Sequence, residues 1–250
     1  MSEANTYAVA ADGVRIAWRA DGDPHAPPLL LCAMGTAALG VWDPIMPGLA
    51  ERRRVIRYDR RGDGDSDPGA PESHSFATYR DDALLVLDAA GCRAAAVAGM
   101  AFGARVATRL ALDAPARVLG LLLFDATAGP PAPEAVRREG SLAALRLREA
   151  AGLARTPIDR GWFERRDPAG AGLARGALEG QPDWTPGLSR VAAPTLVACG
   201  EQDPNLAGAM RMASEIPHAE FRAMPMTGHA SLLDRPDLVL ALMQAFLDAG

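Results

Sequence analysis

The chain has 250 residues, a formal net charge of −5 and a pI near 5.4. This composition excludes the basic surface of proteins that bind nucleic acid through phosphate contacts. The length suits one large α/β domain with a sizeable core better than two independent domains. All 26 basic residues are arginine, which indicates a biased genomic composition rather than a functional cluster.

The three cysteines, Cys32, Cys92 and Cys199, lack the spacing of metal ligands, which predicts buried free thiols in a reducing compartment. No apolar stretch approaches the length of a membrane-spanning helix. Residues 1–10 contain neither the basic nor the apolar segment of a signal peptide. We therefore expect a cytoplasmic protein that binds neither membrane nor nucleic acid; the sequence does not indicate its oligomeric state.

Strand and helix patterns alternate along the first half of the chain, after an opening hairpin. The hairpin is predicted by alternating apolar and polar residues on both sides of Asp12-Gly13. Apolar runs predict the strands that follow, and helical periodicity predicts the helices. These are strands at 29–32, 54–58, 94–98 and 118–124, and helices at 41–51, 75–90 and 102–114.

Residues 127–191 interrupt this alternation, because they are rich in Pro, Gly, Ala and Arg and contain no predicted core strand. They predict an inserted helical lid, with helices at 133–152, 158–166 and 172–178. The alternation then resumes with strands at 195–199 and 219–223 and helices at 206–216 and 236–249. We therefore expect a core of residues 1–126 and 192–250, built on a mostly parallel sheet with helices on both faces.

The turn between the strand at 94–98 and the helix at 102–114 has the spacing of a nucleophile elbow. Gly99 and Gly103 flank a central residue, as in the motif Gly-x-Ser-x-Gly, where a sharp turn holds the serine up towards the substrate. The central residue here is Ala101, whose methyl group cannot attack a carbonyl. The sequence therefore predicts a catalytic turn that lacks its nucleophile.

The other groups of a serine hydrolase are present in the expected order. Such an enzyme needs a general base and an acid that orients the base. His229 follows the last predicted strand and Asp203 follows the strand before it. Groups at the carboxyl ends of parallel strands gather at one edge of the sheet, so we expect both residues beside the elbow. Asp125, after the strand at 118–124, is an alternative acid.

Taken together, these motifs resemble the α/β-hydrolase fold superfamily. The turn Asp59-x-Arg61-Gly62-x-Gly64-x-Ser66 and the pair Gly228-His229 are similar to its motifs, and Met34-Gly35-Thr36 resembles the esterase and 3-oxoadipate enol-lactonase branch. The resemblance implies an eight-stranded, mostly parallel sheet and acyl transfer on an ester or lactone without cofactor or metal. It also implies an oxyanion hole made by the backbone amides of Met34 and Phe102.

Several residues remain open to a structural or a functional interpretation. Trp162, Phe163 and Trp184 either cover an apolar substrate pocket or attach the lid to the core, and Met100 either lines the pocket or packs in the core. Cys32, at the end of a strand, is either a substitute nucleophile or a buried thiol. A further expectation is that Asp59 and Arg61 pair in a solvated turn and that His74 is a surface residue.

Three explanations compete for Ala101. The chain is an engineered Ser→Ala form of a hydrolase, or a natural enzyme that uses His229 and Asp203 for acid–base chemistry, or a ligand-binding pseudoenzyme. Cofactor-free lyases, cyclases and oxygenases of this fold provide a precedent for the second explanation. The retention of Gly99, Gly103, Asp203 and His229 argues against the third, and we favour the first.

Overall fold

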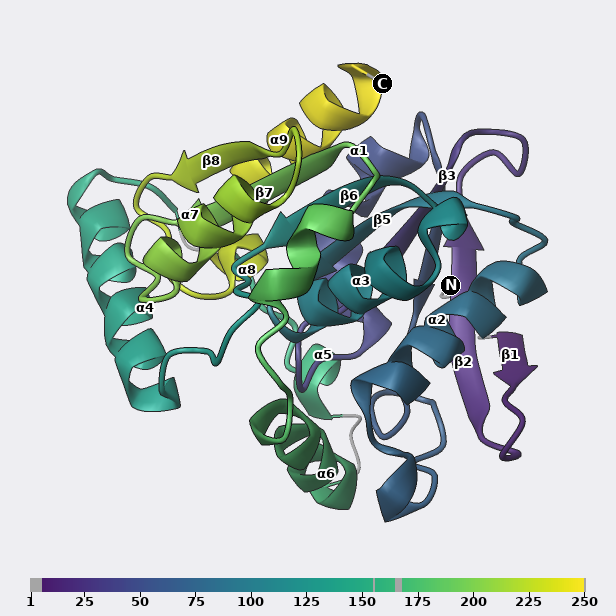
Figure 1. Cartoon of the computed structure of the whole chain (residues 1–250). Coiled ribbons are helices and arrows are strands. Elements are labelled where there is room, and N and C mark those ends of the chain that lie inside the picture. Colours follow the sequence, from purple (N-terminus) through teal and green to yellow (C-terminus); the bar gives the residue numbers. More distant parts are fainter. Residues whose placement is uncertain (1–5, 155, 165–167, 250) are drawn as a thin grey trace.

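The computed structural model describes residues 6–154, 156–164 and 168–249, and its centre is one eight-stranded sheet (Figure 1). The strand order is β1-β2-β4-β3-β5-β6-β7-β8; β2 runs antiparallel to β1 and β4, and all other neighbours are parallel. The strands are β1 (Thr6–Val9), β2 (Arg15–Asp21), β3 (Pro28–Cys32), β4 (Arg54–Tyr58), β5 (Ala95–Met100), β6 (Val118–Phe124), β7 (Thr195–Gly200) and β8 (Glu220–Met224). The predicted fold class is confirmed.

Helices cover both faces of this sheet. The α-helices are α1 (Met46–Ala50), α2 (Phe76–Ala89), α3 (Phe102–Asp113), α4 (Glu134–Ala150), α5 (Gly161–Glu164), α6 (Pro168–Glu179), α7 (Leu206–Glu215), α8 (Ser231–Asp234) and α9 (Pro236–Ala249). Short 3-10 helices lie at Leu39–Ile45, Pro71–Ser73, Pro115–Arg117 and Thr185–Arg190. Among the residues described, no helix has both the length and the apolar character needed to cross a membrane.

The alternation of side chains along each strand divides the core into two clusters. Leu30 and Cys32 of β3 point towards one face, which α2, α3 and α7 cover. Leu29 and Leu31 point towards the other face, which α1 and α9 cover. Buried on both sides, the central parallel strands must be apolar throughout, which explains the continuous apolar runs in the sequence.

Two of the expected helices differ in the structure. The helix expected at 41–51 is a 3-10 helix followed by the short α1, because Pro44 and Pro47 each lack the backbone N–H that a continuous α-helix needs. The helix expected at 158–166 is α5, which has four residues; residues 165 and 166 lie outside the described part of the chain. By contrast, α2 begins as predicted, since Ser75 Oγ accepts a hydrogen bond from the amide of Thr78 (3.1 Å).

The turn after β4 is buried, and its expected Asp59–Arg61 pair is wrong. Asp59 instead accepts hydrogen bonds from the amides of Leu39 (2.6 Å) and Asp65 (2.9 Å). Arg61 forms a bidentate ion pair with Asp82, with both distances 2.7 Å. Because the turn lies under the 3-10 helix that begins at Leu39 and against α2, its charged groups find partners on those elements rather than on each other.

The expectation that His74 is a surface residue is also wrong. It is buried, with Nδ1 2.9 Å from the hydroxyl of Tyr79 and Nε2 2.7 Å from the carbonyl oxygen of Pro68. Its environment lowers the pKa of the imidazole, first through burial. His74 is thus a neutral packing residue that closes the long loop before α2.

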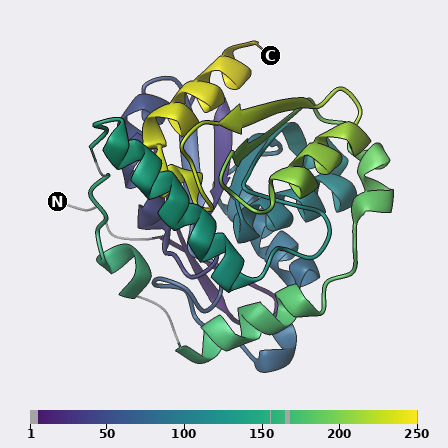
Figure 2. The same ribbon diagram turned by 90° about the vertical axis from the view of Figure 1, so that its left-hand side faces the viewer.

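Helices α4, α5 and α6 lie between β6 and β7 in the chain and outside the sheet (Figures 1 and 2). They occupy the region 127–191, in which no described residue belongs to a strand. Figure 2 shows α4 as a long helix across the front of the molecule. That this region acts as a lid over a substrate stays a prediction.

Candidate active site

The turn between β5 and α3 has a strained backbone at its central residue. Ala101 has φ 49° and ψ −108°, outside the regions that residues with a Cβ atom prefer. Its amide donates to the carbonyl oxygen of Phe124 in β6 (2.8 Å), which fixes the turn on the sheet edge. The elbow geometry is therefore present although the side chain is a methyl group.

The two glycines of the elbow are required by close contacts. A Cβ atom on Gly103 would lie 2.1 Å from the carbonyl oxygen of Cys32, at the end of β3. A Cβ atom on Gly99 would lie 2.4 Å from the carbonyl oxygen of Gly103 itself. Such distances are far inside van der Waals contact, so only glycine permits the first turn of α3 to approach β3 and β5 this closely.

His229 and Asp203 meet at the carboxyl ends of β7 and β8. The Nδ1 atom of His229 lies 2.9 Å from Oδ2 of Asp203. The other carboxylate oxygen of Asp203 accepts from the amide of Asn205 (2.9 Å), and the carboxylate is fully buried. With Nδ1–H donating to Asp203, the Nε2 atom is left as a proton acceptor for chemistry in the site.

Asp125, the alternative acid, lies beside this pair without bonding to the imidazole. Its carboxylate accepts from the amides of Ser231 (2.6 Å) and Gly200 (3.4 Å), and its backbone has a positive φ of 53°. Burial raises the pKa of Asp125 to about 6. Asp125 therefore holds the loops after β7 and β8 together, and Asp203 is the carboxylate that orients His229.

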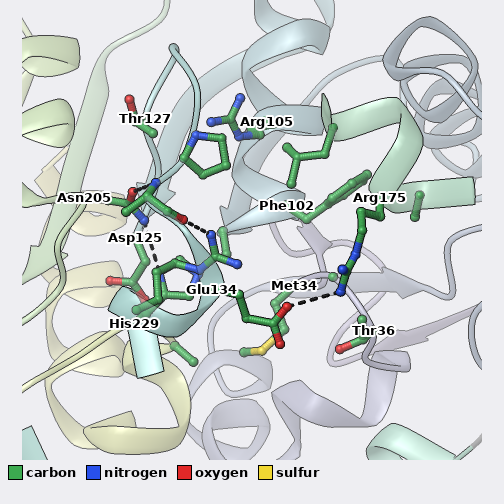
Figure 3. A pocket seen from close by; sticks show the side chains of 18 of the residues that line it. Met34, Thr36, Phe102, Arg105, Asp125, Thr127, Glu134, Arg175, Asn205 and His229 are labelled. Carbon is green, nitrogen blue, oxygen red and sulfur yellow. Dashed lines mark hydrogen bonds and ion pairs between the residues drawn. The ribbon is translucent and has the colours of Figure 1, made fainter. Parts of the chain in front are cut away.

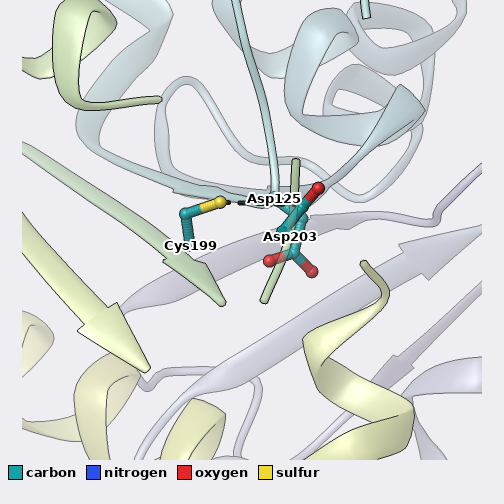
Figure 4. Close-up of side chains that lie close together, drawn as sticks. All are labelled: Asp125, Cys199 and Asp203. Atoms are coloured by element: carbon teal, nitrogen blue, oxygen red, sulfur yellow. Dashed lines mark hydrogen bonds between the residues drawn. The ribbon is translucent and has the colours of Figure 1, made fainter. Parts of the chain in front are cut away.

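Asp125, Asp203 and Cys199 form a buried cluster whose ligand atoms lie within 4.8 Å of one another (Figure 4). The Sγ atom of Cys199 lies 3.6 Å from Oδ2 of Asp203. Burial, and then the two carboxylates, raise the pKa of the Cys199 thiol well above its usual value. The protonated thiol of Cys199 donates to Asp203 and so stabilises the carboxylate that bonds to His229.

A cavity of about 1130 Å³ is lined by Ala101 and His229, two of the three predicted catalytic residues, and by Met34 and Phe102 (Figure 3). Asp203 lies outside this lining. The first amides of a helix have no acceptor within the helix, and the amide of Phe102 is one of these at the start of α3. A Cβ atom on Gly35 would lie 3.3 Å from Cβ of Phe102, so the loop after β3 adjoins this helix start. The two segments expected to form the oxyanion hole are thus neighbours.

The four predicted substrate-binding side chains lie outside the described lining of this cavity. Met100 is fully buried in the sheet core. Trp184 packs edge-on against Phe76, with ring centroids 5.2 Å apart. Trp162 is buried, its carbonyl oxygen accepts from the amide of Ala38 (2.7 Å), and Phe163 packs with it against the same core cluster. Their role in binding stays a prediction that the cavity does not support.

Cys32 is excluded as a nucleophile by its surroundings. It is buried, and burial raises the pKa of its thiol to about 12. The hydroxyl of Tyr58 lies 3.6 Å from its sulfur. Because the thiolate is the reactive form, a thiol with this pKa stays inert at neutral pH. All three cysteines are free and buried, as predicted.

Contacts that no sequence pattern predicts attach α4 to the loop that carries His229. Arg148 donates to the carbonyl oxygen of Met226 (2.7 Å) and to Oδ1 of Asp234 (2.6 Å). The other oxygen of Asp234 accepts from the amide of Gly228 (2.8 Å), directly before His229. In the sequence, nothing distinguishes Arg148 from the other arginines of the region 127–191, so no local signal marks this contact.

The cavity wall also contains arginines, which the sequence analysis attributed to composition. Five line the cavity: Arg60, Arg105, Arg137, Arg138 and Arg175. The guanidinium of Arg60 lies 4.1 Å from the ring centroid of Phe102 and forms an ion pair with Asp63. Arg105 is buried in α3, one turn after Ala101. The wall is thus more basic than the acidic chain as a whole.

Comparison with known proteins agrees with this geometry. The sequence profile of the alpha/beta hydrolase family matches residues 11–242. The chain belongs to this family. A match to Rhodomycin D methylesterase DauP of Streptomyces sp. (strain C5) is 40% identical over 123 residues, which are 48% of this chain and 41% of the methylesterase. The chain therefore matches less than half the length of that relative.

Solved structures match over the whole fold. A hydrolase from Pseudomonas aeruginosa PA01 superposes with a TM-score of 0.81 and 28% identity, covering 97% of this chain and 98% of that one. The enol-lactonase from Burkholderia xenovorans LB400 superposes with a TM-score of 0.80 and 24% identity, covering 97% of this chain and all of the lactonase chain. The second likeness shows the fold alone.

Proposed function

We propose that this chain is a Ser→Ala form of an ester or lactone hydrolase, which binds its substrate and turns it over very slowly. One observation carries the proposal: Ala101, whose φ is positive, lines the same cavity as His229, which is paired with Asp203. A strained turn of this kind costs about 1–3 kcal/mol and persists where the surrounding contacts impose it. The methylesterase relative supports the ester as substrate class, and the solved hydrolase supports hydrolysis as the reaction.

In the serine form, the residues act in a defined order. The Oγ atom at position 101 attacks the carbonyl carbon of the substrate while its proton passes to Nε2 of His229. The oxyanion accepts hydrogen bonds from the amides of Met34 and Phe102. His229 then gives its proton to the leaving alkoxide as the carbon–oxygen bond breaks, which leaves an acyl group on the serine.

Hydrolysis of the acyl group repeats the same steps with water. His229 takes a proton from the water, whose oxygen attacks the acyl carbon, and then returns this proton to the serine oxygen. Asp203 keeps the imidazole oriented and stabilises its positive charge throughout. Without the serine hydroxyl only binding and the oxyanion contacts remain, and turnover falls by about six orders of magnitude.

A second function is favoured by the intact hydrogen bond between His229 and Asp203. In a natural enzyme without the serine, His229 would act on the substrate directly as general base and acid, as in a lyase, cyclase or cofactor-free oxygenase. About one fifth of the His229 side chain is exposed, while Asp203 is fully buried. The imidazole therefore reaches the cavity without any nucleophile at position 101.

The experiment is the substitution Ala101→Ser, assayed on p-nitrophenyl esters, methyl esters and small lactones. The matched control is the double variant Ala101→Ser/His229→Gln. We expect the serine form to hydrolyse an ester at least about 1000-fold faster than the alanine chain, and the double variant to lose this gain. A folded serine form that hydrolyses none of these substrates would contradict the proposal. Turnover by the alanine chain that disappears in His229→Gln would instead support the second function.

A further inference from the structure

Three arginines in the cavity lining have no carboxylate partner among the described residues. Arg138 is exposed, whereas Arg105 is buried and Arg137 is partly buried. Arg105 belongs to α3 and Arg137 to α4, so they come from the core and from the region 127–191. Arg105 donates from Nη2 to the carbonyl oxygen of Gly129, and Arg137 donates from Nη1 to that of Ala132. Both bonds are to neutral acceptors, so neither guanidinium is held in an ion pair by the described residues.

Glu179, which lines the cavity, forms no ion pair with Arg105 or Arg137 among the described residues, and three other acidic residues nearby have other partners. Glu134 pairs with Arg175 (3.1 Å), and Asp125 accepts from two backbone amides. Asp183 attracts Arg105, yet its carboxylate accepts from the amide and the hydroxyl of Thr185 (2.9 and 2.6 Å). Within the described residues, none of these three carboxylates forms an ion pair with Arg105 or Arg137.

The positive charge of Arg137 acts on the buried guanidinium of Arg105. Burial, and then the positive charge of Arg137, lower the pKa of Arg105 to about 10. Arg105 is therefore still charged at neutral pH, although it is only 4% exposed. Two like charges held in one wall without a counterion favour an anion between them, because charge-assisted hydrogen bonds to a carboxylate would satisfy both.

We propose that Arg105 and Arg137 bind a carboxylate of the substrate, so that the ester or lactone at Ala101 belongs to a molecule that also carries an acid group. This proposal rests on the proposed function for the carbonyl end of the substrate. Guanidinium groups suit a carboxylate because their parallel N–H bonds match its two oxygens. The neutral esters of the same acids are the natural comparison.

The helix geometry guides the choice of test substrates. Arg105 lies one turn of α3 after Ala101, since its amide lies 3.4 Å from the carbonyl oxygen of Ala101 and points towards it. One turn advances the helix backbone by about 5.4 Å, so the backbone of Arg105 lies close to the elbow. We therefore test half-esters of short dicarboxylic acids, from succinate to adipate.

Binding is measured first on the alanine chain, which leaves the ester intact. The probes are monomethyl succinate, glutarate and adipate, each against its dimethyl ester, with affinities from calorimetry or NMR titration. We expect at least one half-ester to bind about 10-fold or more tightly than its diester. Arg105→Gln and Arg137→Gln should each weaken half-ester binding about 10- to 100-fold and leave the diester unchanged.

The matched control is Arg109→Gln, one turn further along α3. Arg109 pairs with Asp113 (2.7 Å) and lies outside the cavity lining. Its loss changes the net charge equally, so unchanged half-ester affinity in this variant excludes a general charge effect. If Arg105→Gln unfolds, Arg137→Gln still tests the proposal, because Arg137 is a partly exposed residue of α4.

The outcomes separate this proposal from the proposed function. Equal losses for half-ester and diester in both arginine variants, or no preference for any half-ester, would overturn it. If the arginine variants lose half-ester binding but Ala101→Ser hydrolyses nothing, the carboxylate site stands and the proposed function fails. If Ala101→Ser hydrolyses neutral and acidic esters equally well, in parent and arginine variants alike, only the hydrolase stands.

Discussion

The elbow and the side of the cavity formed by α4 are held in place in different ways. This side, the α4 wall, consists of Glu134, Arg137, Arg138 and Ser141. The elbow is fixed by backbone atoms: the close approach of Gly103 to Cys32 and the hydrogen bond from Ala101 to Phe124 involve no side-chain function. The α4 wall is held by side chains, above all by Arg148, which bonds to the loop that carries His229.

This difference explains how the site keeps its geometry without a nucleophile. Backbone contacts do not depend on the side chain at position 101, so a methyl group leaves the turn in place. A wall held by polar side chains depends on each of them, and each is therefore sensitive to substitution. Under the proposed function, the elbow sets the position of the reacting carbonyl and the α4 wall selects the substrate.

The largest expected effect on stability comes from Gly103→Ala. The added Cβ atom would overlap the carbonyl oxygen of Cys32, 2.1 Å away, so either β3 or α3 must shift. We expect a loss of about 3 kcal/mol or more in the free energy of unfolding, measured by urea titration. The matched control is Gly176→Ala, since that helical glycine is exposed and has open space at its Cβ position. A loss below about 1 kcal/mol for Gly103→Ala would show that the elbow is not held by this contact.

A smaller effect is expected when the α4 wall is detached. Arg148→Met keeps the length of the side chain but removes its bonds to Met226 and Asp234. We expect a loss of about 2 kcal/mol in the free energy of unfolding, because Asp234 is left without its cation. Arg146→Met, at an exposed position of the same helix, should change it by less than about 0.5 kcal/mol. Equal effects of the two variants would mean that Arg148 does not anchor this wall.

The smallest effect should be a gain in stability from Ala101→Gly. Glycine adopts positive φ without the clash of a Cβ atom, so the variant relieves strain at φ 49°. We expect an increase of about 1 kcal/mol in the free energy of unfolding. The comparison is Ala143→Gly, at an exposed position within α4, which should lose about 1 kcal/mol because glycine disfavours a helix interior. If Ala101→Gly also lowers the free energy of unfolding, the backbone at position 101 is not strained in the way proposed.

Much of the fold follows from local sequence patterns. The hairpin at Asp12-Gly13 and the cap at Ser75 result from interactions between neighbours in the chain, and the buried strands are marked by continuous apolar runs, so these elements are predictable. The prediction of one helix at 41–51 was wrong, because two prolines interrupt the apolar pattern there. The expected Asp59–Arg61 pair was wrong for another reason: Asp59 bonds to the amide of Leu39, 20 residues away in the sequence, and Arg61 pairs with Asp82, 21 residues away.

Glycine spacing and strand-end loops are local features of the sequence, so they indicate the family and the candidate catalytic positions. The tertiary structure shows that Asp203 rather than Asp125 bonds to His229, which the sequence left open because both residues follow strands of the same sheet. It also decided which side chains line the cavity, replacing the predicted aromatics with Arg105 and Arg137. Which side chains face a shared cavity depends on how distant segments pack, and no spacing along the chain records this.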